Sequence, residues 1–264
     1  MKKTVIILSA VMATFTVMPA HAETKSLVII DSYFDSRVFG GNVSCVTLAD
    51  KPCVDVVTSI PSSLSNNVNH GDAMVEVAKK QNASLPIIAL EAGTASKTSA
   101  TDVNAGNFID ALNWVLGHST KVSAVSISRY FNGTGGCKPS STNTANYGGV
   151  SKADSTIRNQ ISKLNSIGIK VFVATGNTKG SNIDYPACIE ETNSVSVGAL
   201  NSSGAIVSQF AANATTDYYA SASVYSYKSS VLGLIPNTTS AGNVAVAAKY
   251  VSGILDNKLV NVVN

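Results

Sequence analysis

The stretch 151–177 reads SKADSTIRNQISKLNSIGIKVFVATGN and decides the fold of this 264-residue chain. Apolar residues at helical spacing predict a helix over 151–167, and Gly168 is typical of a helix end. The run 169–174 follows at once and is apolar on both faces, as in a strand buried within a parallel sheet. A helix that leads directly into such a strand indicates a βαβ unit.

Short apolar runs alternate with amphipathic stretches along most of the chain. Strands are predicted over 27–30, 54–58, 85–90, 122–128, 169–174 and 194–200. Helices are predicted over 71–81, 107–116, 151–167 and 241–255. The stretches 131–149 and 211–237 are expected to be long loops, the second of them extended or irregular. The fold class is therefore predicted as α/β, with a doubly wound, mostly parallel sheet flanked by helices.

Residues 1–22 have the form of a signal peptide. Lys2 and Lys3 provide a short basic region, an apolar stretch follows, and Ala-His-Ala at 20–22 is a small-residue cleavage site. The apolar stretch is too short for a stable membrane span. We therefore expect an exported protein, periplasmic or extracellular, with residues 23–264 as a single domain.

The charge of the chain points away from polyanionic partners. Charged residues make up 13% of the sequence, and the formal net charge of +3 falls to about +1 once Lys2 and Lys3 are removed. The sequence contains no run of basic residues. We therefore expect neither nucleic acid nor an anionic membrane surface as a partner.

The four cysteines suit an oxidising compartment. None of them belongs to a Cys-x-x-Cys pair, which argues against a zinc site or a redox motif. Two disulfides are expected, and four cysteines allow three pairings. We favour Cys45 with Cys53, which closes a local loop, and Cys137 with Cys188, which joins distant segments.

Asp31 and His70 are candidates for an acid–base pair. Asp31 ends the strand predicted over 27–30, and the carboxyl ends of parallel strands form the functional crevice of such sheets. A carboxylate there can orient an imidazole, although an Asp that caps a turn gives the same pattern. His70 directly precedes a predicted helix, whose dipole favours the neutral, basic imidazole over its cation. The alternative for His70 is an ordinary loop histidine, and His118 is assigned no role.

Asn177 and Ser240 are candidates for the oxyanion donor and the nucleophile. Gly176 permits a sharp turn after an apolar strand, so the Asn177 amide can point into the crevice, although Gly-Asn turns are common. Ser240 stands at the start of a predicted helix, where a serine also serves as an N-cap. The order Asp, His, Ser along the chain is informative, because unrelated triad enzymes use other orders.

Together these segments resemble the active-site segments of the subtilisin-like serine peptidases. The matching stretches are VIIDS at 28–32, HGD at 70–72, VFVATGN at 171–177 and TSAG at 239–242. The resemblance extends over residues 27–255. It implies a secreted serine endopeptidase that acts on protein or peptide substrates, with Asp31, His70 and Ser240 as the triad and Asn177 in the oxyanion hole.

The chain departs from the family pattern around the nucleophile. Thr238 stands where the family has Gly, Gly242 where it has Ala, and Val244 where it has Pro. Asp72 replaces the Thr that follows His-Gly. Because a Thr resists backbone conformations that a Gly permits, Thr238 is expected to alter the approach of Ser240.

Two family features are expected to be missing at the N-terminus. Only a few residues separate the signal peptide from the first strand, which leaves no room for a propeptide. The chain then folds without one, or a separate inhibitor or chaperone protein supplies its role. The usual calcium-binding N-terminal segment is also absent, so we expect no metal and no cofactor.

A second interpretation is a catalytically inactive subtilase-like module used for binding, for example a toxin-associated one. The altered nucleophile motif and the missing propeptide favour this alternative. A nucleotide-binding domain is not expected, because no Gly-x-Gly-x-x-Gly segment or P-loop follows a predicted strand. The residues of the substrate pockets diverge too far from the family to predict specificity.

Overall fold

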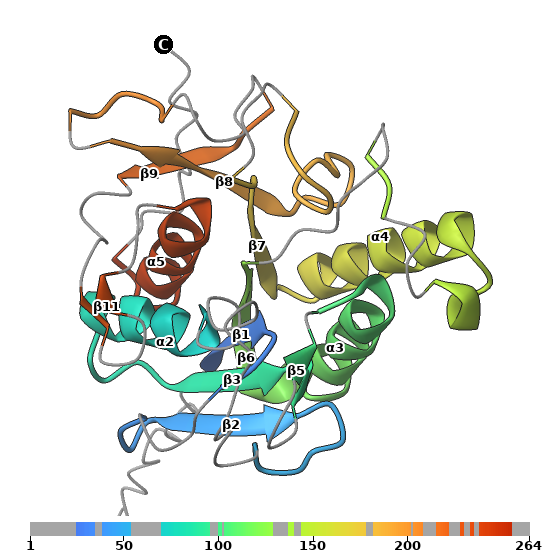
Figure 1. The fold of residues 1–264 in the computed structure, drawn as a ribbon, viewed down its shortest axis with the longest axis horizontal. Coiled ribbons are helices and arrows are strands. Elements are labelled where there is room, and N and C mark those ends of the chain that lie inside the picture. Colours follow the sequence, from blue (N-terminus) through green and yellow to red (C-terminus); the bar gives the residue numbers. More distant parts are fainter. Residues whose placement is uncertain are drawn as a thin grey trace, which may run out of the picture.

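A computed structural model defines the architecture of the chain (Figure 1). It describes residues 25–34, 39–53, 70–95, 100–101, 103–128, 137–139, 144–177, 182–201, 203–207, 215–221, 228–229, 233–234 and 238–254. A seven-stranded sheet has the order β2-β3-β1-β6-β7-β8-β9. Every pairing within this sheet is parallel.

The strands of this sheet are short, and the central ones are almost completely buried. The strands are β1 (Ser26–Asp31), β2 (Val43–Thr47), β3 (Ile87–Glu91), β6 (Val122–Ile127), β7 (Lys170–Ala174), β8 (Val195–Leu200) and β9 (Tyr218–Ser221). The helices are α2 (His70–Gln81), α3 (Ala105–Gly117), α4 (Val150–Ser166) and α5 (Thr239–Val251), with short 3-10 turns at Ser119–Lys121 and Ala145–Tyr147. Two small antiparallel pairs join β4 (Thr94–Ala95) with β5 (Ala100–Thr101) and β10 (Lys228–Ser229) with β11 (Gly233–Leu234).

Helices cover both faces of the sheet, so the predicted doubly wound α/β architecture is confirmed. Alternate residues of each strand point to opposite faces. Leu27 and Ile29 join one apolar cluster with α2 and α5, whereas Val28 and Ile30 join a second cluster with α3 and α4. Figure 1 shows the same arrangement, with α2 and α5 on one side of the strands and α3 and α4 on the other.

The sheet has a topological switch point at β1. The chain continues from β1 to β2 and β3 on one side and then crosses to β6, β7, β8 and β9 on the other side. Ligands of doubly wound proteins bind at the carboxyl ends of the strands next to such a point. The residue at the carboxyl end of β1 is Asp31.

Several predicted boundaries differ from those of the structure. Strand β3 begins after Pro86, because proline offers no N–H to a ladder. Strand β2 was not predicted, and the strand predicted over 54–58 lies outside the described residues. Strand β9 lies in a stretch predicted as a long loop, and helix α5 ends at Val251 rather than at 255.

Both predicted disulfides are present. Cys45 and Cys53 are eight residues apart in sequence, with 5.5 Å between their Cα atoms. Cys137 and Cys188 are 51 residues apart, with 5.6 Å between their Cα atoms. The second bond therefore joins the segment beyond β6 to the segment beyond β7.

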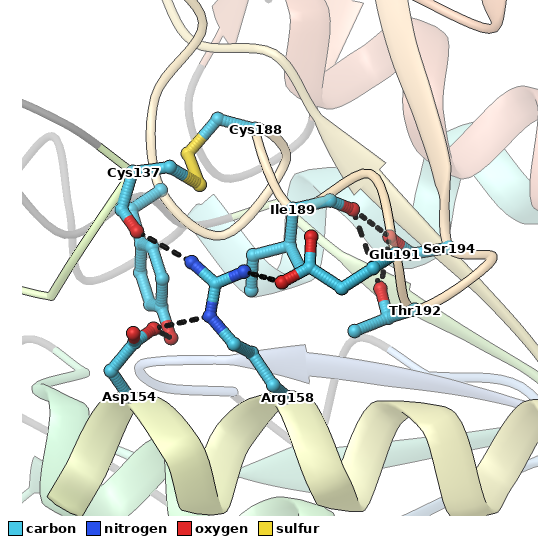
Figure 2. Close-up of a disulfide and its surroundings, with 9 residues drawn as sticks. Cys137, Asp154, Arg158, Cys188, Ile189, Glu191, Thr192 and Ser194 are labelled. Carbon is cyan, nitrogen blue, oxygen red and sulfur yellow. Dashed lines mark hydrogen bonds and ion pairs between the residues drawn. A yellow bond between two sulfur atoms is a disulfide. The ribbon is translucent and has the colours of Figure 1, made fainter. Parts of the chain in front are cut away.

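Arg158 of α4 reinforces the contact around the second disulfide (Figure 2). Its guanidinium donates to the Cys137 carbonyl at 2.7 Å and to Asp154 Oδ1 at 2.9 Å, and it pairs with Glu191. The same Asp154 carboxylate accepts from the Tyr185 hydroxyl at 3.0 Å. These contacts fix the segments on either side of the disulfide to α4 through its half-buried residues Asp154 and Arg158.

The described part of the chain contains no helix that is both long enough and apolar enough to cross a membrane.

Candidate active site

Asp31 and His70 meet at the carboxyl end of β1. His70 Nδ1 lies 2.7 Å from Asp31 Oδ2, and the Asp31 side chain is fully buried. The second carboxylate oxygen, Oδ1, accepts from the Ser32 backbone N–H at 2.7 Å. The carboxylate therefore has a fixed orientation, and the contact selects Nδ1 as the ring nitrogen that carries the proton.

Gly71 allows His70 to reach the carboxylate. A Cβ atom at this position would lie 2.5 Å from the Tyr33 carbonyl oxygen and 2.7 Å from the Phe34 ring. The backbone at the start of α2 can therefore approach the turn after β1 only because residue 71 has no side chain. His70 keeps 21% of its side chain exposed. Its Nε2 atom makes no hydrogen bond to any other described residue.

The turn after β7 fixes the orientation of the Asn177 amide. Asn177 Oδ1 accepts from the Thr239 backbone N–H and from Thr239 Oγ1, each at 3.0 Å. Since a backbone N–H can only donate, the oxygen is the end of the amide that faces Thr239. The Nδ2 donor is therefore the end of the amide that does not contact Thr239.

Gly176 is required by the same turn. Its φ of +107° is a conformation that side chains rarely adopt. A Cβ atom there would also lie 1.9 Å from an Asp184 carboxylate oxygen. The Gly176 N–H donates to Thr239 Oγ1 at 3.2 Å, so the Thr239 hydroxyl joins the turn to the start of α5.

Ser240 lies in the first turn of α5 and is almost completely buried. Its hydroxyl donates to the Ser128 carbonyl at 3.1 Å, and the Ser128 hydroxyl donates to the Ser240 carbonyl at 3.3 Å. Within the described residues, no hydrogen bond joins Ser240 Oγ to His70. The candidate nucleophile and the candidate base thus lie in two separate hydrogen-bonded groups.

Thr238, not Ser240, is the N-cap of α5. Its side chain accepts from the Ala241 N–H at 3.2 Å, and its φ of −135° is ordinary extended backbone. The alternative of Ser240 as the N-cap was therefore wrong. The expectation that Thr238 alters the approach of Ser240 stays a prediction, although residue 238 does not use a glycine-specific conformation.

The first backbone N–H groups of α5 differ in their hydrogen-bond partners. The Thr239 N–H donates to Asn177, and the Ala241 N–H donates to Thr238. Among the described residues, no acceptor is found for the Ser240 N–H. The first turn of a helix leaves such donors for a ligand or for water.

Asn243 anchors the helix that carries Ser240. Its Nδ2 donates to Ser126 Oγ and to the Ile127 carbonyl, each at 3.0 Å. A longer contact of 3.4 Å reaches the Phe172 carbonyl of β7. Helix α5 is therefore attached to the two strands that lead to Ser128 and Asn177.

The two remaining departures from the family motif fit the packing of α5. A Cβ atom at Gly242 would lie 3.3 Å from the Ala220 Cβ and 3.5 Å from the Gly198 carbonyl oxygen. The missing side chain therefore lets α5 pack closely on β8 and β9. Val244, at the Pro position, is fully buried in the apolar cluster shared by α2 and α5.

The structure brings the four predicted residues together as two pairs of neighbours. Asp31 contacts His70, and Asn177 contacts the residue that precedes Ser240. Thr239 and Ser128 were assigned no role from the sequence: Thr239 directly precedes Ser240, and Ser128 ends the strand predicted over 122–128. Within the described part of the chain, no three His, Cys, Asp or Glu side chains gather as a group that could hold a metal ion.

Comparisons with known proteins agree with the fold described above. No family model matches the sequence, and no curated protein matches it. A mutant form of the protease domain of PatA is similar with a TM-score of 0.60 and 12% identity over 87% of this chain and 78% of that chain. The prenylagaramide maturation protease PagA gives a TM-score of 0.57 and 14% identity, over 86% of this chain and 74% of that chain.

A third solved structure, a cold-adapted subtilisin-like serine proteinase, gives a TM-score of 0.53 and 16% identity over 90% of this chain and 78% of that chain. All three proteins are similar over most of the chain, although few residues are identical. The chain therefore has the subtilisin-like fold, as the sequence motifs predicted.

Proposed function

We propose that the chain is an exported serine endopeptidase with Ser240 as nucleophile, His70 as general base and Asp31 as the carboxylate that orients the base. The observation that carries the proposal is the 2.7 Å contact between His70 Nδ1 and Asp31 Oδ2 at the switch point of the sheet. A buried carboxylate on Nδ1 leaves Nε2 as the nitrogen that accepts a proton. The protease names of the structurally similar proteins support this reaction class.

In the proposed reaction, the Ser240 hydroxyl turns from the Ser128 carbonyl toward His70 Nε2. Its oxygen bonds to the carbonyl carbon of the scissile peptide while its proton moves to Nε2. Asp31 stabilises the resulting imidazolium. The C–N bond then breaks as Nε2 gives the proton to the leaving amine, and water hydrolyses the acyl group with the same base.

Two donors are available for the developing oxyanion. The Asn177 amide has its oxygen fixed by Thr239 and therefore presents Nδ2, and the Ser240 N–H has no acceptor among the described residues. Donors held in place before the reaction stabilise a new charge without reorganisation. We propose that both bind the oxyanion and that the reaction uses no cofactor.

We also propose that residues 1–22 direct export and that residues 23–264 form one peptidase domain. Residues 1–22 lie outside the described residues. The two disulfides support an oxidising destination, because disulfides are uncommon in reducing compartments. Protein or peptide segments are the proposed substrates.

An inactive binding module is the second candidate function. The observation that favours it is the Ser240 hydroxyl, which donates to Ser128 rather than to His70. In such a module the four residues would keep structural roles only. The altered residues at positions 238, 242 and 244 are compatible with either function, because each fits its surroundings in the fold.

A quenched-fluorescent peptide library tests the proposal. The protein is purified after export and compared with the Ser240→Ala and Asp31→Asn variants. We expect cleavage by the wild type and a loss of at least about 10³-fold in both variants. A folded, disulfide-bonded wild type that cleaves no member of the library would favour the binding module. Equal cleavage by Ser240→Ala would exclude Ser240 as the nucleophile.

A further inference from the structure

Glu91 is a second buried carboxyl group beside Asp31, and the proposed reaction does not use it. It is the last residue of β3, only 4% exposed, and it pairs in register with Asp31 of β1. Residues paired in register on parallel strands point to the same face of the sheet. That face is covered by α2 and α5, so both carboxyl groups point toward the helix that carries His70.

The turn after β1 is attached to the end of β3 at three points. The Ala92 N–H donates to the Asp31 carbonyl at 2.9 Å, and the Gly93 N–H donates to the Ser32 carbonyl at 3.0 Å. The third contact uses a side chain, because the Phe34 N–H donates to Glu91 Oε2 at 3.3 Å. Glu91 thus holds the far end of this turn through a hydrogen bond.

This turn is also the surface on which α2 begins. Gly71 approaches the Tyr33 carbonyl and the Phe34 ring so closely that a Cβ atom at Gly71 would lie within 3 Å of both. Phe34 itself is fully buried. Because His70 immediately precedes Gly71, a shift of Phe34 moves the imidazole relative to the Asp31 carboxylate.

We propose that Glu91 is a positioning residue for the candidate active site: by accepting the Phe34 N–H it fixes the turn 31–34, and through Gly71 it sets the contact between His70 and Asp31. The effect of Glu91 on catalysis rests on the proposed function. Its effect on the His70–Asp31 contact rests only on the structure.

The charge state of Glu91 suits this role. Burial raises the pKa of Glu91 to about 7, although the hydrogen bond from the Phe34 backbone lowers it. The titratable side chains of the elements on this face are Asp31 on β1, His70, Asp72, Glu76, Lys79 and Lys80 on α2, and Lys249 and Tyr250 on α5. A neutral carboxyl group avoids a second negative charge beside Asp31 and still has an oxygen that accepts from Phe34.

Two variants separate the reach of the side chain from its ability to ionise. Glu91→Gln keeps a side-chain oxygen at the same distance and cannot ionise, whereas Glu91→Asp can still ionise and is one methylene too short to reach the Phe34 N–H. Glu190→Gln is the matched control, because Glu190 is an exposed carboxylate on another segment. Each protein is examined by the low-field proton NMR signal of His70 Nδ1–H and by its labelling rate with a fluorophosphonate.

The proposal predicts that Glu91→Gln and Glu190→Gln retain the His70 signal and that Glu91→Asp loses it. The labelling rate should fall about 10- to 100-fold in Glu91→Asp and stay within about threefold of the wild type in Glu91→Gln. An unchanged signal in Glu91→Asp, or its loss in a folded Glu91→Gln, would overturn the proposal. If the wild type is not labelled, the proposed function fails, while the NMR signal still decides the role of Glu91.

Discussion

In one half of the candidate site, the Asp31 carboxylate and the His70 imidazole are 2.7 Å apart, whereas in the other half the Ser240 hydroxyl donates to the Ser128 carbonyl. The first contact depends on the close approach of two backbone segments at Gly71. The second depends on a single hydroxyl, which can change its partner by rotation about one bond. The candidate base is therefore fixed by the fold, and the proposed reaction requires only the candidate nucleophile to move.

The comparison predicts that the largest loss follows removal of the base. His70→Ala should lower the rate of fluorophosphonate labelling by about 10⁴-fold, because His70 is the proposed base for the Ser240 proton. His118→Ala is the matched control and should label like the wild type, since His118 stacks on Trp114 away from the site. Equal rates for the wild type and His70→Ala would show that the Asp31–His70 pair has no part in the reaction.

Removal of one oxyanion donor should have the next largest effect. Asn177→Asp keeps an oxygen for the Thr239 contacts but replaces the Nδ2 donor with a negative charge. We expect peptide cleavage to fall about 10²- to 10³-fold. Asn201→Asp is the control, because Asn201 Oδ1 likewise accepts from the backbone N–H and the hydroxyl of one residue, Ser203. A small loss in Asn177→Asp would mean that Nδ2 does not face the oxyanion.

A methyl group at Gly71 should disturb the Asp31–His70 contact without removing any functional group. Gly71→Ala places a Cβ atom 2.5 Å from the Tyr33 carbonyl, so α2 has to shift and carry His70 with it. We expect about a 10-fold slower labelling rate and a loss of about 1–3 kcal/mol of stability in urea unfolding. Gly117→Ala, which meets no atom within 4 Å, should change neither quantity.

The smallest expected effect concerns the dependence of stability on pH. Because burial raises the pKa of Glu91 from 4.5 to about 7, the folded protein holds a proton that the unfolded chain releases. The stability from this proton is present below pH 4.5 and is lost as the pH rises through 7. Between about pH 5 and pH 8, the melting temperature of the wild type should therefore fall by about 5 °C more than that of Glu91→Gln. Parallel curves would contradict the raised pKa.

Sequence patterns predicted the central strands and the helices because these elements bury continuous or periodic apolar residues. The run 169–174 became β7 with its start shifted by one residue. The edge strands were harder to predict. Strand β2 is only partly buried, and β9 lies in a segment rich in Tyr, Ser and Ala, so neither has a marked apolar pattern.

The candidate residues of the site could be named from sequence because each follows or begins a recognisable element. Their contacts could not be predicted in the same way. The Ser128–Ser240 pair and the Glu91–Phe34 bond join segments 112 and 57 residues apart, and their geometry depends on the packing of α5 and on the sheet register. Ser151 with Asp154 also fits a capping pattern, yet α4 begins at Val150 after Gly149, and Asp154 pairs with Arg158 instead.

The most direct test of the proposed function is a crystal structure of the protein after reaction with a fluorophosphonate. The proposed function predicts a phosphorus atom bonded to Ser240 Oγ, with a phosphonyl oxygen within hydrogen-bonding distance of Asn177 Nδ2 and the Ser240 N–H. The Ser128 carbonyl should then no longer accept a hydrogen bond from Ser240 Oγ. An unmodified Ser240 whose hydroxyl still donates to Ser128, or an adduct whose oxygen faces away from Asn177, would contradict it.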